Sequence, residues 1–255
     1  MQEKSKGVVM FATNTADTDY VLIADRTAKL VEHHLGLPVT VISKNPGAST
    51  NQRFSVDLSK FVEWNNKGRY SVFDDSPYDT TLLLDADYVM LDNRMLDLFD
   101  LVDDYKIMRN NVCLPDEIYG DSLGEYSFSA SWATAIIFNK TEKSRLLFDL
   151  VSRVQSNYAY YRSLYNISAT NYRNDYAFTI ADRMLSGYTE DIRTQIPWTM
   201  TTLQGSIHSM EFKGSQLVIR YENNALILPR QDVHVLGKQY LQSDNFGNFV
   251  EAVIA

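Results

Sequence analysis

Cysteine, long apolar runs and clusters of basic residues are all scarce in this sequence. Its single cysteine, Cys113, excludes an internal disulfide framework and favours a reducing compartment, so we expect a cytoplasmic protein. No apolar run approaches the ~20 residues that a transmembrane helix needs. The apolar stretch near the start of the sequence is too short for a signal peptide, and no small-residue cleavage site follows it. We therefore expect no transmembrane segment.

The missing runs of lysine and arginine also bear on partners, because the chain carries a formal net charge of −8. Generic nucleic-acid binding normally needs a basic surface, so a nucleic-acid acceptor is not expected here, although this balance does not exclude one. An anionic ligand would need a metal ion or a few local cations to receive it. The 255 residues are enough for one large α/β domain.

The order of predicted elements indicates an α/β fold. Strands are predicted at 7–13, 38–43 and 80–85, and the helical spacing of 19–35 ends at Gly36. Helical or irregular sequence is expected at 60–70. This order implies parallel strands and a mostly parallel central sheet flanked by helices. Farther along we predict a strand at 131–139, helices at 142–158 and 174–185, and β structure over 216–235.

A buried strand that ends in two acidic residues is the most informative feature. In TLLLDADYVMLD, residues 81–92, three leucines lead into Asp85 and Asp87. Residues i and i+2 of an extended segment point to the same side, and two carboxylates there repel unless a cation lies between them. Mg²⁺ or Mn²⁺ prefers such oxygen ligands and leaves positions for phosphate oxygens. The alternative is that one aspartate caps the next helix and the other is solvated.

The chain contains a second D-x-D triplet that serves as an internal control. Asp17 and Asp19 follow the first predicted strand in a polar stretch that leads into a helix. Aspartate is favoured at helix N-caps because its carboxylate accepts hydrogen bonds from the first backbone N–H groups. We therefore predict a capping role for Asp17 or Asp19 and reserve metal binding for the later pair.

Two enzyme classes place D-x-D after an apolar strand. In the haloacid dehalogenase-like phosphatases the first aspartate is a nucleophile, and a threonine normally follows the second. Here Tyr88, Val89 and Met90 follow, and at least two predicted strands precede the motif, whereas the phosphatase motif usually lies on the first strand. The other class is the nucleotide-sugar glycosyltransferases.

Four blocks, in the correct order, resemble the A-type nucleotide-sugar glycosyltransferases, closest to the glycogenin-like retaining group (family 8-like). They are the metal-binding strand (76–91), the acceptor strand with its Phe-Asn turn (129–151), the helix whose acidic residue lies beside the reacting sugar (173–184) and a closing His-x-x-Gly element (233–238). Two departures are present. Trp132-Ala133-Thr134 replaces the usual Asn-x-Gly, and Gln239-Tyr240 replaces an aromatic ending.

The resemblance implies a single Rossmann-like domain over 1–255, with a nucleotide-binding half at 1–92 and an acceptor-binding half at 93–255. It implies transfer of a sugar from a nucleotide-diphosphate sugar, a UDP-sugar first of all, to an acceptor hydroxyl. Mn²⁺ or Mg²⁺ would be held by Asp85, Asp87 and His234, with Asp87 and His234 outside the packed core. The alternative for His234 is a histidine packed at a strand end.

Some residues predicted to contact the donor lie at the ends of strands, where ligands bind in parallel sheets, and the resemblance adds Arg69, Gly237 and Lys238. This set comprises Ala12, Thr13, Asn14, Arg69, Asp85, Ala86, Gly237 and Lys238. Glycine lets the backbone approach a phosphate closely, and lysine supplies a point charge. Turn chemistry at 12–14 and at Gly237, and a surface position for Arg69, are the alternatives.

Asp175, with Asn174, is the predicted catalytic residue near the anomeric carbon. It would stabilise an oxocarbenium-like state or attack it in a retaining enzyme, and act as general base in an inverting one. The alternative is a helix N-cap. Trp132 and Thr134 are predicted to contact the acceptor, although Trp132 would suit a core equally well.

The sequence leaves the acceptor open among a saccharide, a lipid-linked glycan, a protein side chain and a modified nucleobase, and it leaves the oligomeric state open as well. Two other functions remain as alternatives: the dehalogenase-type phosphatase and a non-catalytic domain that binds a sugar nucleotide.

Overall fold

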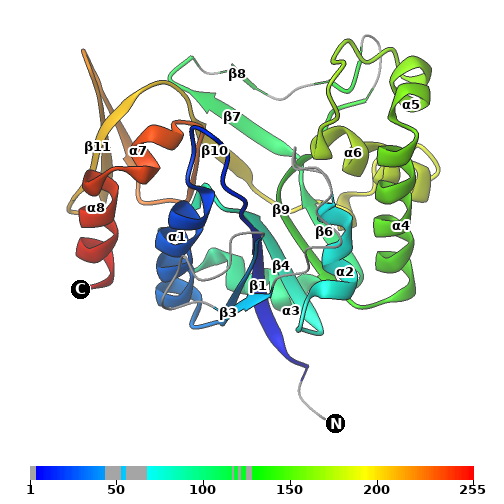
Figure 1. The fold of residues 1–255 in the computed structure, drawn as a ribbon, viewed down its shortest axis with the longest axis horizontal. Coiled ribbons are helices and arrows are strands. Elements are labelled where there is room, and N and C mark those ends of the chain that lie inside the picture. The colour runs from blue at the N-terminus through cyan, green and yellow to red at the C-terminus, as the bar shows by residue number, and fades with distance from the viewer. Residues whose placement is uncertain (1–3, 44–52, 56–67, 117, 120–121, 125–127) are drawn as a thin grey trace.

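A six-stranded mixed sheet, in the order β3-β2-β1-β4-β9-β6, forms the centre of the molecule (Figure 1). The computed structural model describes residues 4–43, 53–55, 68–116, 118–119, 122–124 and 128–255. Four strands run parallel: β1 (Lys6–Phe11), β2 (Val39–Ile42), β3 (Arg53–Ser55) and β4 (Thr80–Asp85). β9 (Trp132–Asn139) is antiparallel to β4 and to β6 (Tyr105–Met108). The predicted α/β class with a mostly parallel sheet is confirmed.

Both faces of this sheet are covered by helices, which explains the continuous apolar run in β4. On one face Met10 and Leu84 join a core with α1 (Tyr20–Leu35) and α8 (Asp244–Ile254). On the other face Val9 and Leu83 join a second core with α4 (Glu142–Ser156) and α6 (Asn174–Leu185). Figure 1 shows α1 and α8 on one side of the sheet and α4 and α6 on the other. Alternate residues of each strand thus belong to different cores.

Two smaller sheets complete the fold. One, in the order β5-β14-β10-β7-β8, contains β5 (Tyr88–Val89), β7 (Asn110–Leu114), β8 (Ile118–Tyr119), β10 (Thr199–Leu203) and β14 (Val233–Val235). The other contains β11 (Ile207–Lys213), β12 (Gln216–Tyr221) and β13 (Ala225–Pro229). Strands β12, β13 and β14 confirm the β structure predicted over 216–235.

The fold also contains the short helices α2 (Val72–Asp75), α3 (Asp97–Leu101), α5 (Tyr158–Leu164) and α7 (Lys238–Gln242) and the 3₁₀ turns η1 (Arg69–Ser71), η2 (Arg94–Leu96) and η3 (Ile192–Thr194). The predicted helix at 142–158 ends at Ser156, and α5 follows it. Most of the stretch predicted as helical or irregular, 60–67, lies outside the described residues. Among those that are described, no helix combines the length and the apolar character that crossing a bilayer requires.

Helix α1 begins and ends where the sequence predicts. The Asp19 carboxylate accepts a hydrogen bond from the Leu22 N–H at 2.9 Å, so the earlier D-x-D does supply an N-cap. Gly36 adopts a left-handed conformation, with φ 62°, and its N–H donates to the Glu32 carbonyl. These two residues set the length of the helix that covers β1.

His34, near the end of α1, should make the fold sensitive to acid. Burial first, and then His33 and Arg230, lower the pKa of His34 to about 4, while Asp92 opposes them. An unfolded chain takes up this proton near pH 6.5, so the unfolded state binds more protons between about pH 6.5 and 4. Stability should therefore fall as the pH drops through that window.

The expected effect of His34→Gln is a smaller loss of Tm between pH 7 and pH 5 than in the wild type. Because His34 is only half-buried, we expect about 1 kcal/mol, or roughly 2–4 °C in a chain of this size. His208→Gln, at an exposed histidine, is the matched control. Identical acid sensitivity of all three proteins in thermal melts would contradict the assignment.

Candidate functional site

The structure brings Asp85, Asp87 and His234 together at the carboxyl ends of the parallel strands. Asp85 ends β4 and lies opposite Phe11 of β1. The chain then turns, and β5 pairs with β14 so that Tyr88 faces His234 and the Val235 N–H donates to the Asp87 carbonyl at 3.0 Å. Ligand atoms of the two carboxylates and the imidazole all lie within 4.8 Å of one another.

Two cations contact this acidic pair. Arg69 forms an ion pair with Asp85, and Lys238 forms one with Asp87. His234 Nε2 lies 3.5 Å from Asp87 Oδ1. Arg69 is only 7% exposed, so its interpretation as a surface arginine is wrong. Asp87 and His234 are buried at 7% and 5% exposure, so the expectation that they lie outside the packed core is also wrong. His234 lies on β14, between β5 and β10 in its sheet, and Asp87 directly precedes β5.

The two carboxylates respond differently to these surroundings. Burial alone would raise the pKa of Asp87, but His234 and Lys238 outweigh it and hold that pKa well below the usual range. Burial raises the pKa of Asp85, and the charge of Asp87 adds to the rise although Arg69 opposes it. The neighbours of Asp87 therefore keep it ionised. A further positive charge at the site would favour the ionised form of Asp85.

This donor set suits a hard divalent cation. Two carboxylates and an imidazole match the ligand preferences of Mg²⁺ and Mn²⁺, and a shell of three protein ligands leaves room for oxygens of a ligand. The cation would compete with Arg69 and Lys238 for Asp85 and Asp87. The metal-ligand roles of all three residues stay predictions.

The residues predicted to meet base and ribose lie beside this group at the end of β1. Thr13 is buried, and its hydroxyl has no hydrogen-bond partner among the described residues. The Asn14 side-chain oxygen accepts from the Val21 N–H at 3.0 Å, as the turn interpretation expects. Ala12 is fully buried, and the Ala86 carbonyl accepts from the Thr27 hydroxyl at 2.8 Å. The Thr13 hydroxyl thus has hydrogen-bonding capacity that no described residue uses.

Gly237 has a packing reason of its own to be glycine. A Cβ placed there would lie 3.0 Å from the Gly205 carbonyl oxygen, and its φ of −73° is available to any residue. Close backbone packing thus accounts for this glycine without a phosphate. The neighbouring Lys238 donates to the Val235 carbonyl at 3.0 Å besides pairing with Asp87, which places its ammonium group at the acidic pair.

Asp175 ties helix α6 to strand β9. Its Oδ1 accepts from the Ala133 N–H at 2.8 Å, and its Oδ2 accepts from Arg173 Nη2 at 2.7 Å. Arg173 occupies the N-cap, so the interpretation of Asp175 as a cap is wrong. The charge of Asp175 also raises the pKa of Asp85, which places Asp175 within electrostatic reach of the site. Asn174 is buried beside it and accepts from the Tyr172 hydroxyl at 2.9 Å.

The predicted acceptor residues begin strand β9. The Trp132 ring centroid lies 6.4 Å from that of His234, and its indole Nε1 is buried without a partner among the described residues. Trp132 also packs against the core on the α1 side of the sheet, so both of its interpretations have support. Ala135 lies opposite Leu84 in the antiparallel pair of β9 and β4. The buried Thr134 is therefore one residue closer than Ala135 to the end of β4 where Asp85 lies.

Sequence reasoning missed two tyrosines at this site. The pKa of Tyr20 is raised by burial and by Asp87 and Asp85, against Lys238, so its phenol lies among the site charges. The pKa of Tyr172 is raised by burial first and then by the charge of Asp175. The signal for Tyr20 was its position at the first turn of the helix that follows β1. For Tyr172 no local pattern marked it, because only the fold brings it beside Asn174.

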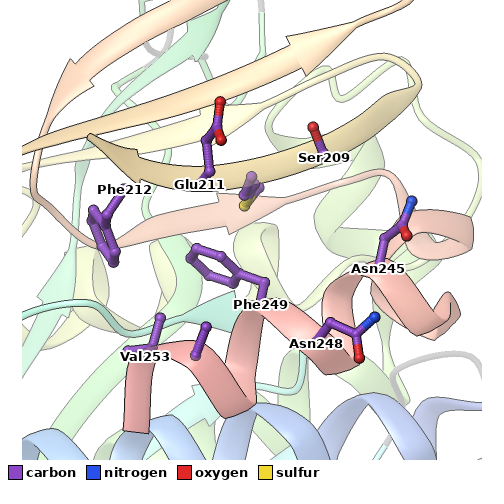
Figure 2. Close-up of a pocket in the computed structure, with 9 residues that line it drawn as sticks. Ser209, Glu211, Phe212, Asn245, Asn248, Phe249 and Val253 are labelled. Atoms are coloured by element: carbon purple, nitrogen blue, oxygen red, sulfur yellow. The ribbon is translucent and has the colours of Figure 1, made fainter. Parts of the chain in front are cut away.

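A separate cavity of about 500 Å³ lies between β11 and α8. Figure 2 shows Phe212 and Phe249 beside each other in its lining, with ring centroids 5.8 Å apart, and Asn245 and Asn248 on the helix. None of the predicted site residues lines this cavity. The candidate site at Asp85 and this cavity are therefore different places in the fold.

The chain is similar to several solved glycosyltransferases. For GlyE of Streptococcus pneumoniae TIGR4 the TM-score is 0.38 at 15% identity, over 63% of this chain and 44% of that chain. For an active-site mutant of LgtC it is 0.43 at 16% identity, over 69% of both chains. For the galactosyltransferase LgtC with donor and acceptor sugar analogs it is 0.41 at 15% identity, over 67% and 68%.

No family model matches the chain, and neither does any curated protein. The chain spans less than half of the length of GlyE.

Proposed function

We propose that this protein is a metal-dependent glycosyltransferase that moves a sugar from a nucleotide-diphosphate sugar to an acceptor hydroxyl. The observation that carries the proposal is the meeting of Asp85, Asp87 and His234 within 4.8 Å at the carboxyl edge of the parallel strands, where α/β sheets bind ligands. A UDP-sugar donor, Mn²⁺ as the ion and retention of configuration are the finer parts of the proposal.

The chain's own residues have distinct roles in this proposal. A divalent cation held by Asp85, Asp87 and His234 would supply the positive charge that a departing diphosphate needs. Lys238 and Arg69 supply two further cations at the same place. In a water-poor pocket fixed charges of this kind stabilise developing negative charge more effectively than they would in water.

Asp175 is the proposed carboxylate at the anomeric centre, supported by its electrostatic reach to Asp85. Trp132 and Thr134 are the proposed acceptor contacts. We extend the proposal to one domain over residues 1–255, with donor binding in 1–92 and acceptor binding in 93–255. The single cysteine supports a cytoplasmic location.

A donor screen tests the proposal. The purified protein is incubated with Mn²⁺ and UDP-, GDP- or CDP-sugars, and release of the free sugar is measured without an acceptor. We expect hydrolysis of at least one donor that depends on the metal. Phosphate release from p-nitrophenyl phosphate without donor hydrolysis would indicate a phosphatase instead. Binding of UDP without any hydrolysis or transfer would indicate a non-catalytic domain.

Binding of Mn²⁺ should be weak until a nucleotide diphosphate is present. The reason is that Arg69 and Lys238 already neutralise Asp85 and Asp87, and three protein ligands fill only part of a shell that prefers six oxygens. Titration calorimetry with Mn²⁺ alone and then with UDP measures this. Equally tight binding in both titrations would contradict it, and AMP in place of UDP is the control ligand.

A further inference from the structure

His234 has a second ring nitrogen whose partner lies deep in the protein. Its Nδ1 is 3.2 Å from the hydroxyl of Thr202, which is fully buried on β10. β10 pairs with β14 so that Thr202 lies opposite His234, and with β7 so that Thr202 also lies opposite Cys113. The backbone register of three neighbouring strands therefore fixes this contact.

The hydrogen of the Thr202 hydroxyl is already committed. The hydroxyl donates to Asn111 Oδ1 at 2.6 Å, and the Asn111 amide in turn donates to Cys113 Sγ at 3.2 Å. A hydroxyl has one hydrogen, so Thr202 has only a lone pair left for His234. Neutral His234 must then carry its proton on Nδ1, which leaves the Nε2 lone pair on the side of Asp87.

We infer that Thr202 and Asn111 are positioning residues that hold His234 in the Nδ1–H tautomer, with Nε2 ready to ligate a metal ion. The inference rests on the proposed function for the metal, because it concerns the nitrogen that faces Asp87 and Asp85. Histidines that bind metals usually donate their other N–H to a fixed acceptor, which sets the tautomer and the ring orientation.

Reversing the direction of the hydrogen bonds from Asn111 through Thr202 to His234 would give the opposite tautomer. If Asn111 donated to Thr202 and Thr202 donated to Nδ1, the proton of His234 would lie on Nε2 and face Asp87. The separation of 3.5 Å between Nε2 and Asp87 Oδ1 is longer than a normal N–H···O bond, whereas 3.2 Å to Thr202 is within range. The two arrangements are distinguishable in the protein without metal.

The test is a long-range ¹H–¹⁵N correlation spectrum of the metal-free protein at an alkaline pH where the imidazole shifts are constant. The chain has four histidines, so the signals that vanish in His234→Gln assign His234. We expect the Nδ1–H pattern in the wild type and in Thr202→Ser, which keeps the hydroxyl. An Nε2–H pattern in the wild type would overturn the inference.

Asn111→Leu sharpens the test, because it removes the acceptor and lets Thr202 donate to Nδ1. We expect His234 to convert to the Nε2–H form and the affinity for Mn²⁺ with UDP to fall by about 10–100-fold. Thr40→Val, at a buried threonine bonded to Tyr78, is the control and should change neither. An unchanged tautomer in folded Asn111→Leu would contradict the inference, and the wild-type spectrum decides it if that variant does not fold.

Failure of the proposed function would look different. A wild-type protein with the Nδ1–H tautomer that hydrolyses no sugar nucleotide would support the positioning by Thr202 and contradict the glycosyltransferase. A protein that hydrolyses donors with the Nε2–H tautomer would do the reverse.

Discussion

Asp87→Asn is expected to lower sugar-nucleotide turnover with Mn²⁺ by more than ~100-fold, a larger loss than changes around a metal ligand usually cause. Asp87 contacts Lys238 and lies 3.5 Å from His234, so it is the residue where the charges of the site converge. Asparagine keeps the shape of the side chain but removes the charge. His234→Gln should cause a loss of similar size.

These substitutions are chosen because both positions are buried. Alanine would leave a hole beside β5 and β14, and the loss of folding would then be confused with loss of a ligand. Asp87→Asn leaves Lys238 without its ion-pair partner, so we expect a drop of a few degrees in Tm but a folded protein. Activity and thermal melts are measured on the same preparation.

The second D-x-D triplet supplies the matched control. Asp17→Asn changes an exposed aspartate in the same motif and should keep normal turnover and Tm. If Asp87→Asn and His234→Gln both keep near-normal turnover at saturating Mn²⁺, the metal assignment is wrong. If only one of these variants keeps near-normal turnover, the residue changed in it is not a metal ligand, and the other two residues of the group hold the metal.

Features set by neighbouring residues along the chain were predictable. Asp19 and Gly36 bound helix α1 because capping depends on side chains within a few positions. The apolar run before Asp85 predicted a strand covered on both faces, and the structure has helices on both. Asp85 and Asp87 do come together as predicted, but not through the two-residue period of an extended chain, because β4 ends at Asp85 and residues 86 and 87 form a turn.

Features set by pairing between distant strands were not predictable from local pattern. Arg69 was predicted to contact the donor only through the resemblance, with a surface position as the alternative, and no local pattern indicated that it would be buried and paired with Asp85. The placement of His234 was anticipated only through a family resemblance, because the β5–β14 pairing that brings it to Asp87 joins segments far apart in sequence. The contact between Thr202 and His234 has no local signal at all, since it depends on the register of β10 and β14.

Asp175→Asn should lower kcat by about 100-fold or more and leave the KM for the donor unchanged, if Asp175 acts at the anomeric centre. An interaction made only in the transition state affects turnover and not ground-state binding. The structure also gives Asp175 a scaffold role through the Ala133 N–H and Arg173. The amide oxygen of asparagine can still accept from Ala133, so the loss of charge is the principal change.

Arg173→Gln separates the two roles, because it breaks the ion pair and leaves the carboxylate in place. Arg173 is 44% exposed at its side chain, so the pair itself contributes only ~1 kcal/mol or less to stability. A structural role for Asp175 predicts similar kcat and Tm in both variants, whereas a catalytic role predicts a large loss of kcat in Asp175→Asn alone. Equal turnover in the two variants would mean that Asp175 has a structural role only. The acidic residues of 116–125 would then be the next candidates for the catalytic carboxylate.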